Sequence, residues 1–118
     1  MTDAILRVKW RYNFMKRTEI VNRIADVIHR TIPDAEAILY GSEARGDATP
    51  QSDIDLLILV DKEKLSVAEE EQITMPLYLI ELETGIEIHP IVMMKKNWEN
   101  RPIKTPFYIN VLNEGVRI

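Results

Sequence analysis

The 118-residue sequence contains no cysteine. This absence excludes disulfide bonds, zinc–thiolate centres and thiol catalysis, so any metal ion must be held by oxygen or imidazole ligands. Long apolar runs are also missing, because no stretch approaches the roughly 20 residues that a membrane-spanning helix needs. The N-terminus lacks the uninterrupted apolar core of a secretory signal. We therefore expect a cytoplasmic protein that does not act at a membrane.

The length and the charge pattern limit the number of domains and the kinds of partner that the chain can have. A chain of this length with 46% hydrophobic residues is large enough for one core but too small for two. The formal net charge of -4 is unevenly distributed, since residues 1–30 hold seven Lys or Arg and three Asp or Glu. The rest of the chain is therefore strongly acidic. General attraction of the whole protein to nucleic acid is not expected.

The first fourteen residues form a basic segment in which apolar and polar residues alternate from Leu6 to Phe14, with three cations among them. This period-two pattern is typical of a strand. The segment could add an edge strand, contact the phosphates of a nucleic acid, or be a loose end. Met15 also reads as a natural beginning, so an upstream start codon is a further interpretation. We divide the chain into an N-terminal extension, residues 1–14, and a single domain, residues 15–118, and favour no function for the extension.

The first half of the domain alternates between helix and strand patterns. Ile20, Ile24 and Ile28 follow helical spacing, and Pro33 predicts that this helix ends near Thr31. Short strands are predicted over residues 36–40 and 54–60. The second is apolar on both alternating faces and is therefore expected to be central and covered on both sides. The connection over residues 43–52 is expected to begin with a helical turn.

The second half contains two helix starts marked by proline. Thr74 with Pro76 predicts a helix that ends at Gly85, and Thr105 with Pro106 predicts a last helix that ends near Gly115. Between them, residues 86–93 read as a third strand. Its Pro90 indicates that one side of that strand lacks a regular ladder partner. The apolar sides of the two helices are assigned to Leu77, Ile80 and Leu82 and to Phe107, Val111 and Leu112.

Two aspartates stand at the beginning of the central strand, where it is still open to solvent. Asp53 and Asp55 share one strand face about 6.5–7 Å apart. Two carboxylates at that separation can bind a pair of magnesium ions, the arrangement that stabilises both the attacking and the leaving oxygen in phosphoryl displacement. Upstream, Gly41 allows close approach of a polyanion and Ser42 offers a hydroxyl and an amide. The sequence therefore predicts a phosphate cradle beside a pair of metal ligands.

The complete pattern resembles a known signature. Gly41-Ser42, ten further residues and Asp53-Ile54-Asp55-Leu56 are similar to the signature of the nucleotidyltransferase superfamily that includes the DNA polymerase beta palm. With Ala44-Arg45-Gly46 and Ser52, the string resembles minimal nucleotidyltransferases, small proteins commonly encoded beside a HEPN-domain protein as antitoxin and toxin. The resemblance extends from Met15 to about Met94. It implies an α+β (mixed α/β) nucleotidyltransferase fold with a small mixed β-sheet and flanking helices.

The resemblance also assigns roles to individual residues. Gly41 and Ser42 would hold the triphosphate, and Asp53 and Asp55 would bind two Mg2+ ions. The third carboxylate of the family is usually an aspartate on the third strand, and the available acid is Glu87. Glu87 is longer by one methylene and shares its strand face with His89, so the metal could sit differently or the third ligand could be lost. For Glu87 and His89, two interpretations stay open: they bind the metal, or they are the polar side chains of an ordinary solvated strand face.

Arg45 has two interpretations. It can bind the nucleotide phosphates, or it can neutralise the two aspartates, and the second is favoured because unpaired buried charge is costly. Glu43 is assigned to the surface rather than to catalysis.

The implied reaction moves a nucleoside monophosphate, with AMP from ATP as the first choice, from a nucleoside triphosphate to an acceptor hydroxyl. The resemblance suggests a tyrosine of a HEPN-family ribonuclease toxin as the acceptor, which makes the chain an antitoxin that acts by AMPylation. Two alternatives stay open. One is a binding-only antitoxin with the same fold, and the other is an antibiotic-modifying subunit completed by a separate chain.

Overall fold

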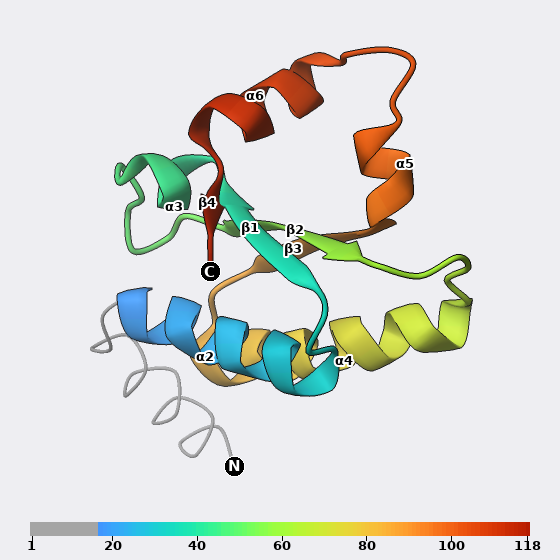
Figure 1. The fold of residues 1–118 in the computed structure, drawn as a ribbon. Helices are drawn as coiled ribbons and strands as arrows, with labels where there is room; N and C mark the ends of the chain where they lie inside the picture. Colours follow the sequence, from blue (N-terminus) through green and yellow to red (C-terminus); the bar gives the residue numbers. More distant parts are fainter. Residues whose placement is uncertain (1–16) are drawn as a thin grey trace.

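Four strands form one mixed sheet in the order β3-β2-β1-β4. The computed structural model describes residues 17–118, so the predictions for the N-terminal extension lie outside the described residues. The strands are β1 (Glu36–Tyr40), β2 (Ile54–Val60), β3 (Ile88–Met94) and β4 (Val116–Arg117). β1 pairs antiparallel with β2 and with β4, whereas β2 and β3 run parallel. The predicted mixed sheet with flanking helices is confirmed (Figure 1).

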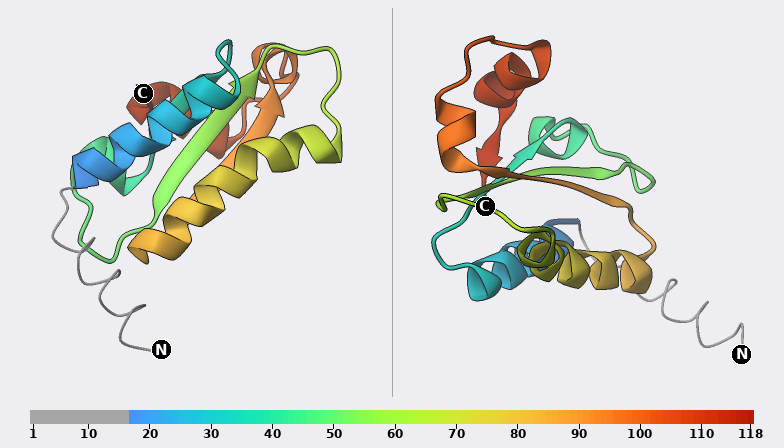
Figure 2. Two further views of the ribbon diagram at one scale, coloured as in Figure 1. Left: turned by 90° about the horizontal axis from the view of Figure 1, so that it is seen from below. Right: turned by 90° about the vertical axis from the view of Figure 1, so that its right-hand side faces the viewer.

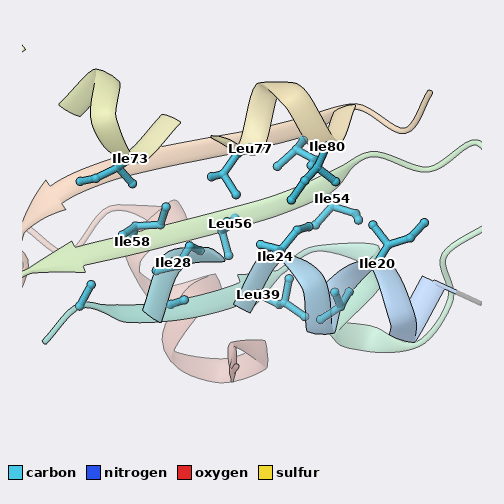
Figure 3. Packing of buried hydrophobic residues seen from close by; sticks show 14 of the residues in the cluster. Ile20, Ile24, Ile28, Leu39, Ile54, Leu56, Ile58, Ile73, Leu77 and Ile80 are labelled. Carbon is cyan, nitrogen blue, oxygen red and sulfur yellow. The ribbon is translucent and has the colours of Figure 1, made fainter. Parts of the chain in front are cut away.

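One face of the sheet is covered by two long helices, α2 (Arg17–Thr31) and α4 (Val67–Thr84), which lie side by side beneath it (Figure 2). Ile24 of α2 and Leu77 of α4 converge on Leu56 of β2 in the main core (Figure 3). Five residues of β2 are completely buried, and they include neighbours that point to opposite faces. The prediction of a central strand covered on both sides is therefore confirmed.

The other face is covered only in part, by α5 (Lys95–Glu99) and α6 (Pro106–Glu114). Trp98 of α5 and Val111 of α6 are buried against Leu57 and Leu59 of β2 in a second, smaller core. Phe107 packs edge-on against Trp98, with ring centroids 6.0 Å apart. The two helices on this face have only 5 and 9 residues, against 15 and 18 for α2 and α4.

The predicted start of the helix before Gly85 was wrong. α4 begins at Val67 rather than near Thr74, because Ser66 and Glu69 form a capping box that satisfies the first amides of the helix. Pro76 therefore lies inside the helix, where it removes one backbone hydrogen bond. Packing of Ile73 and Leu77 on either side of it holds the helix together.

Several smaller differences concern the second half of the chain. β3 is an edge strand, as Pro90 indicated, but it begins at Ile88 rather than residue 86. Leu82 and Leu112, which were assigned to the inner sides of their helices, are 54% and 59% exposed. The short helix α5 and the two-residue strand β4 carry no signal that the sequence patterns revealed. Within residues 17–118, no helix combines the length and the apolar character that crossing a membrane requires.

Candidate active site

The turn after β1 is built around Gly41, whose φ of 75° lies in the region that favours glycine. Gly41 caps α3 (Ser42–Arg45), the short helical turn that the sequence predicted at this point. A Cβ atom at this position would lie 2.6 Å from Oδ2 of Asp55. The glycine is thus required both by its backbone conformation and by the closeness of the carboxylate.

Asp55 lies in β2, directly opposite Tyr40 of β1 and His89 of β3. Asp53 precedes the strand and shares the face of Asp55 that points away from α2 and α4. Partial burial raises the pKa of the Asp55 carboxyl, and the nearby Asp53 adds to this effect, whereas the charges of His89 and Arg45 oppose it. A partly desolvated carboxylate near a second one is a position where a bound cation would be favoured.

The third strand brings two further polar side chains to the same face. Nε2 of His89 lies 3.0 Å from Oε2 of Glu87 and 3.6 Å from Oδ2 of Asp53. The hydrogen bond with Glu87 is the main cause that raises the pKa of the His89 imidazole above its usual value. Ligand atoms of Asp53, Glu87 and His89 all lie within 4.8 Å of one another. Asp55 is not part of this group.

Asp53, Glu87 and His89 fit a divalent cation, because carboxylate and imidazole are the donors available to a chain without cysteine, and Asp55 lies beside this group on the same sheet face. Asp53 and Asp55 lie at the beginning of β2, and Glu87 and His89 at the beginning of β3, so two adjacent strand ends supply all of these side chains. Glu87 is therefore placed beside Asp53, where the third carboxylate was predicted. The geometry also brings His89 into the group, which the sequence indicated only through its shared strand face.

Arg45 does not pair with Asp53 or Asp55, the partners that the sequence favoured. Its guanidinium donates to Asp47, at 3.2 Å, and to Glu114, at 3.3 Å, and these hydrogen bonds raise its pKa. It acts on Asp55 only through its charge. The side chain is 47% exposed and lies at the end of α3, so it remains available to an anion bound beside Gly41.

Glu114, at the end of α6, was not identified from the sequence. Its Oε1 accepts a hydrogen bond from the amide of Gly41, at 3.1 Å, and also faces Arg45. Two of the groups predicted to hold phosphate therefore share a carboxylate partner. The residues lie 73 positions apart, and no local pattern connects them.

Arg17 was also missed, and Glu43, which the sequence assigned to the surface rather than to catalysis, is partly buried. Arg17 donates to Oε1 of Glu43 at 2.6 Å, and the two side chains are only 16% and 13% exposed. The same guanidinium donates to the carbonyl oxygen of Ser52 at 2.7 Å. The first residue of α2 thus fastens α3 to the residue that precedes Asp53, across the connection between β1 and β2.

Comparison with known proteins agrees with this geometry. Residues 21–118 match the family model described as a nucleotidyltransferase domain. The chain belongs to this nucleotidyltransferase family. Two relatives from Methanocaldococcus jannaschii are both named "Putative protein adenylyltransferase". One is 36% identical over 106 residues, covering 88% of this chain and all of the relative. The other is 41% identical over 78 residues, covering 66% of this chain and 71% of the relative.

A solved structure supports the fold independently. The chain is similar to the crystal structure described as a putative nucleotidyltransferase from Sulfolobus solfataricus, with a TM-score of 0.50 over 96% of this chain and 84% of the other. At 17% identity this likeness shows the fold alone. The predicted nucleotidyltransferase fold is confirmed, and the chain is a transferase enzyme of this family.

Proposed function

We propose that this nucleotidyltransferase moves AMP from ATP to a hydroxyl group of a partner protein, with pyrophosphate as the second product. The proposal is supported chiefly by one observation: Asp53, Asp55, Glu87 and His89 share a sheet face beside the Gly41 turn. The relatives named as protein adenylyltransferases favour AMP and a protein acceptor over other nucleotides and acceptors.

The candidate roles divide between the two sides of the site. Gly41, Ser42 and Arg45 would hold the triphosphate, because backbone amides and a guanidinium are donors suited to phosphate oxygens. Asp53, Asp55 and Glu87, with His89 beside them, would hold Mg2+. When bound, the metal would neutralise charge on the triphosphate and lower the pKa of the acceptor hydroxyl.

The transfer step forms one bond and breaks one. The acceptor oxygen bonds to the α-phosphorus of ATP, and the bond from that phosphorus to the oxygen bridging to the β-phosphate breaks. The electron pair of the broken bond leaves with pyrophosphate, and the proton of the acceptor hydroxyl passes to water. Arg45 would stabilise the charge that develops on the leaving group, since it lies at the end of α3 beside the proposed triphosphate position.

The proposed acceptor is a tyrosine of a HEPN-family partner, which makes the chain an antitoxin that silences its toxin by AMPylation. Residues 17–118 form one sheet with its flanking helices and include no second domain that would hold a small-molecule acceptor. A partner protein that carries its own hydroxyl to the site is therefore the simplest acceptor.

Radiolabel transfer tests this proposal. The full chain, a HEPN-family partner and Mg2+ are incubated with ATP labelled on either the α- or the γ-phosphate. We expect label on the partner only from α-labelled ATP and none with the Asp53→Ala, Asp55→Ala double variant. Asp61→Asn is the matched control, because Asp61 is an exposed aspartate just beyond the far end of β2. Full transfer by the double variant would contradict the mechanism.

A second candidate, a binding-only antitoxin, is favoured by the third-strand acid. Glu87 would stand in place of the family's usual aspartate, and it is hydrogen bonded to His89. Glu87→Ala separates the two functions. An enzyme loses transfer while its complex with the partner survives, whereas a pure binding protein keeps both complex formation and neutralisation.

A further inference from the structure

Helix α4 is apolar on two opposite sides. Its inner side, with Ile73, Leu77 and Ile80, is buried in the main core (Figure 3). Its outer side carries four large apolar side chains that are 51% to 54% exposed. They follow helical spacing and form one continuous line, which we call the α4 stripe: Met75, Tyr78, Leu79 and Leu82.

The α4 stripe borders a hollow at the open edge of the sheet. A cavity of about 340 Å³ lies between Met75, Tyr78 and Glu81 of α4 and Ile88 and Pro90 of β3. β3 is the outer strand on this side, and Pro90 has no amide to donate to a further strand. Apolar side chains that line a helix in this pattern, next to a groove, are the arrangement that receives an amphipathic helix.

The charges that helix α4 itself carries all have one sign, and two of them, Glu69 and Glu83, are paired with Lys62 and Arg23. α4 contains five glutamates and no lysine or arginine: Glu69, Glu70, Glu71, Glu81 and Glu83. Glu71 lies one helical turn before Met75 and continues the line of the stripe. Glu81 lines the hollow itself. A ligand of this surface should therefore present basic groups around an apolar centre.

We propose that the α4 stripe binds a helix of a partner protein whose apolar side is bordered by lysine and arginine. A second copy of this chain is a poor ligand, because two α4 helices placed face to face would oppose glutamate with glutamate. A membrane of anionic lipid would be repelled by the same charge.

The position of the stripe deepens the proposed function, on which it rests in one respect: the partner is taken to be the acceptor protein. α4 covers the sheet face to which Ile54 and Leu56 point, whereas Asp53 and Asp55 point to the opposite face. A helix bound to the stripe would therefore leave the candidate active site open. It would also hold the partner close to β3, the strand that carries His89.

A fluorescent designed peptide tests this surface directly, without nucleotide. The peptide has the length of α4, with leucine repeating at i, i+3, i+4 and i+7 and lysine at the other positions. A twin peptide carries glutamate in place of lysine. We expect the lysine peptide to bind the full chain and the glutamate twin not to bind. The Met75→Gln, Leu79→Gln, Leu82→Gln variant should lose affinity about tenfold or more, since side chains that become desolvated near the centre of an interface carry most of its binding energy.

Ile109→Gln, Leu112→Gln on α6 is the matched control, because these apolar residues are also exposed, at 43% and 59%, and lie outside the stripe. This control should bind the lysine peptide like the native chain, and Glu71→Gln should lower the affinity for the lysine peptide. ATP binding should not change in the stripe variant. Peptide binding therefore tests the α4 stripe, and ATP binding tests the proposed reaction separately.

Three outcomes would overturn the proposal. The first is equal binding of the lysine peptide to the native chain and to the stripe variant. The second is a native dimer, seen by sedimentation at twice the 13.7 kDa of the chain, that the stripe substitutions convert to monomer. The third is displacement of the lysine peptide by a synthetic peptide of residues 1–14, which would assign the stripe to the chain's own segment.

Discussion

Gly41 and Asp55 lie so close that a Cβ atom on the glycine would come within 2.6 Å of the carboxylate oxygen. One end of β1 therefore fixes the position of the carboxylate on β2. The phosphate side and the metal side of the candidate active site are in direct contact through this pair.

Gly41→Ala tests this contact, and Gly46→Ala is its control. Both glycines have positive φ, but only Gly46, with φ 84° and ψ 12°, is left-handed helical, so Gly46→Ala should cost about 1–2 kcal/mol of stability in urea unfolding. Gly41, with φ 75° and ψ -154°, lies in a region almost restricted to glycine, so Gly41→Ala should cost about 1–3 kcal/mol from the backbone alone. Gly46 has no neighbouring atom within 4 Å of the added Cβ. Only Gly41→Ala should displace Asp55 and weaken ATP binding. Unchanged ATP affinity in Gly41→Ala would show that the carboxylate position does not matter for the nucleotide.

Arg17→Gln tests the fastening of the connection between β1 and β2. The variant leaves the partly buried Glu43 without its cation and the carbonyl of Ser52 without its donor. We expect a loss of about 1–3 kcal/mol in the free energy of unfolding, as for hydrogen bonds to charged groups. ATP binding should weaken as well, because Asp53 follows Ser52 directly.

Lys96→Gln is the matched control for Arg17→Gln. Lys96 pairs with Glu63, which is 92% exposed, so the loss of stability should be much smaller than in Arg17→Gln and ATP binding should not change. Equal losses in the two variants would contradict a special role of Arg17.

Glu114→Gln should tighten nucleotide binding. The carboxylate of Glu114 occupies the Gly41 amide and faces Arg45, both of which we assign to the triphosphate. Removing one negative charge beside an anion is worth on the order of 1 kcal/mol, or about fivefold in affinity, at a partly exposed position. Glu99→Gln serves as the control, since Glu99 lies on α5 and its side chain is 58% exposed. Weaker ATP binding in Glu114→Gln would instead assign Glu114 to holding Arg45 in place.

Glu69, in the first turn of α4, should make the free energy of unfolding depend on pH. Hydrogen bonding to Lys62 and Ser66 lowers the pKa of Glu69 from 4.5 to about 2. Because the folded-state pKa is depressed, the contribution of Glu69 is complete above pH 4.5 and is lost as the pH falls toward 2. Glu69→Gln should therefore be less stable than the native chain near neutral pH. The difference, measured by urea unfolding, should shrink below pH 4.5, and a difference that is constant down to pH 2 would contradict this assignment.

The sequence predicted the parts of the site that depend on local order. Alternation along β2 places Asp53 and Asp55 on one face, and the glycine after β1 marks the turn that approaches them. These features follow from strand geometry and from the conformational freedom of glycine, which a short stretch of sequence reveals.

The parts that were missed depend on contacts between distant positions. Arg17 meets Glu43 and Ser52 across 26 and 35 residues, and Glu114 meets Gly41 across 73 residues. No periodic pattern marks such pairs, because they arise only when the helices pack on the sheet. The error at α4 was of another kind, since the Ser66–Glu69 capping signal was present and Pro76 was given more weight.

Isothermal titration calorimetry with magnesium ATP tests the central claim most directly, which is that the Gly41 turn and the two aspartates form one nucleotide site. The native chain, the Asp53→Ala, Asp55→Ala variant and the Asp61→Asn control are titrated with and without Mg2+. We predict metal-dependent binding to the native chain and to the control, and none to the double variant. Binding of equal strength to the double variant, or no binding by the native chain at millimolar ATP, would contradict the account.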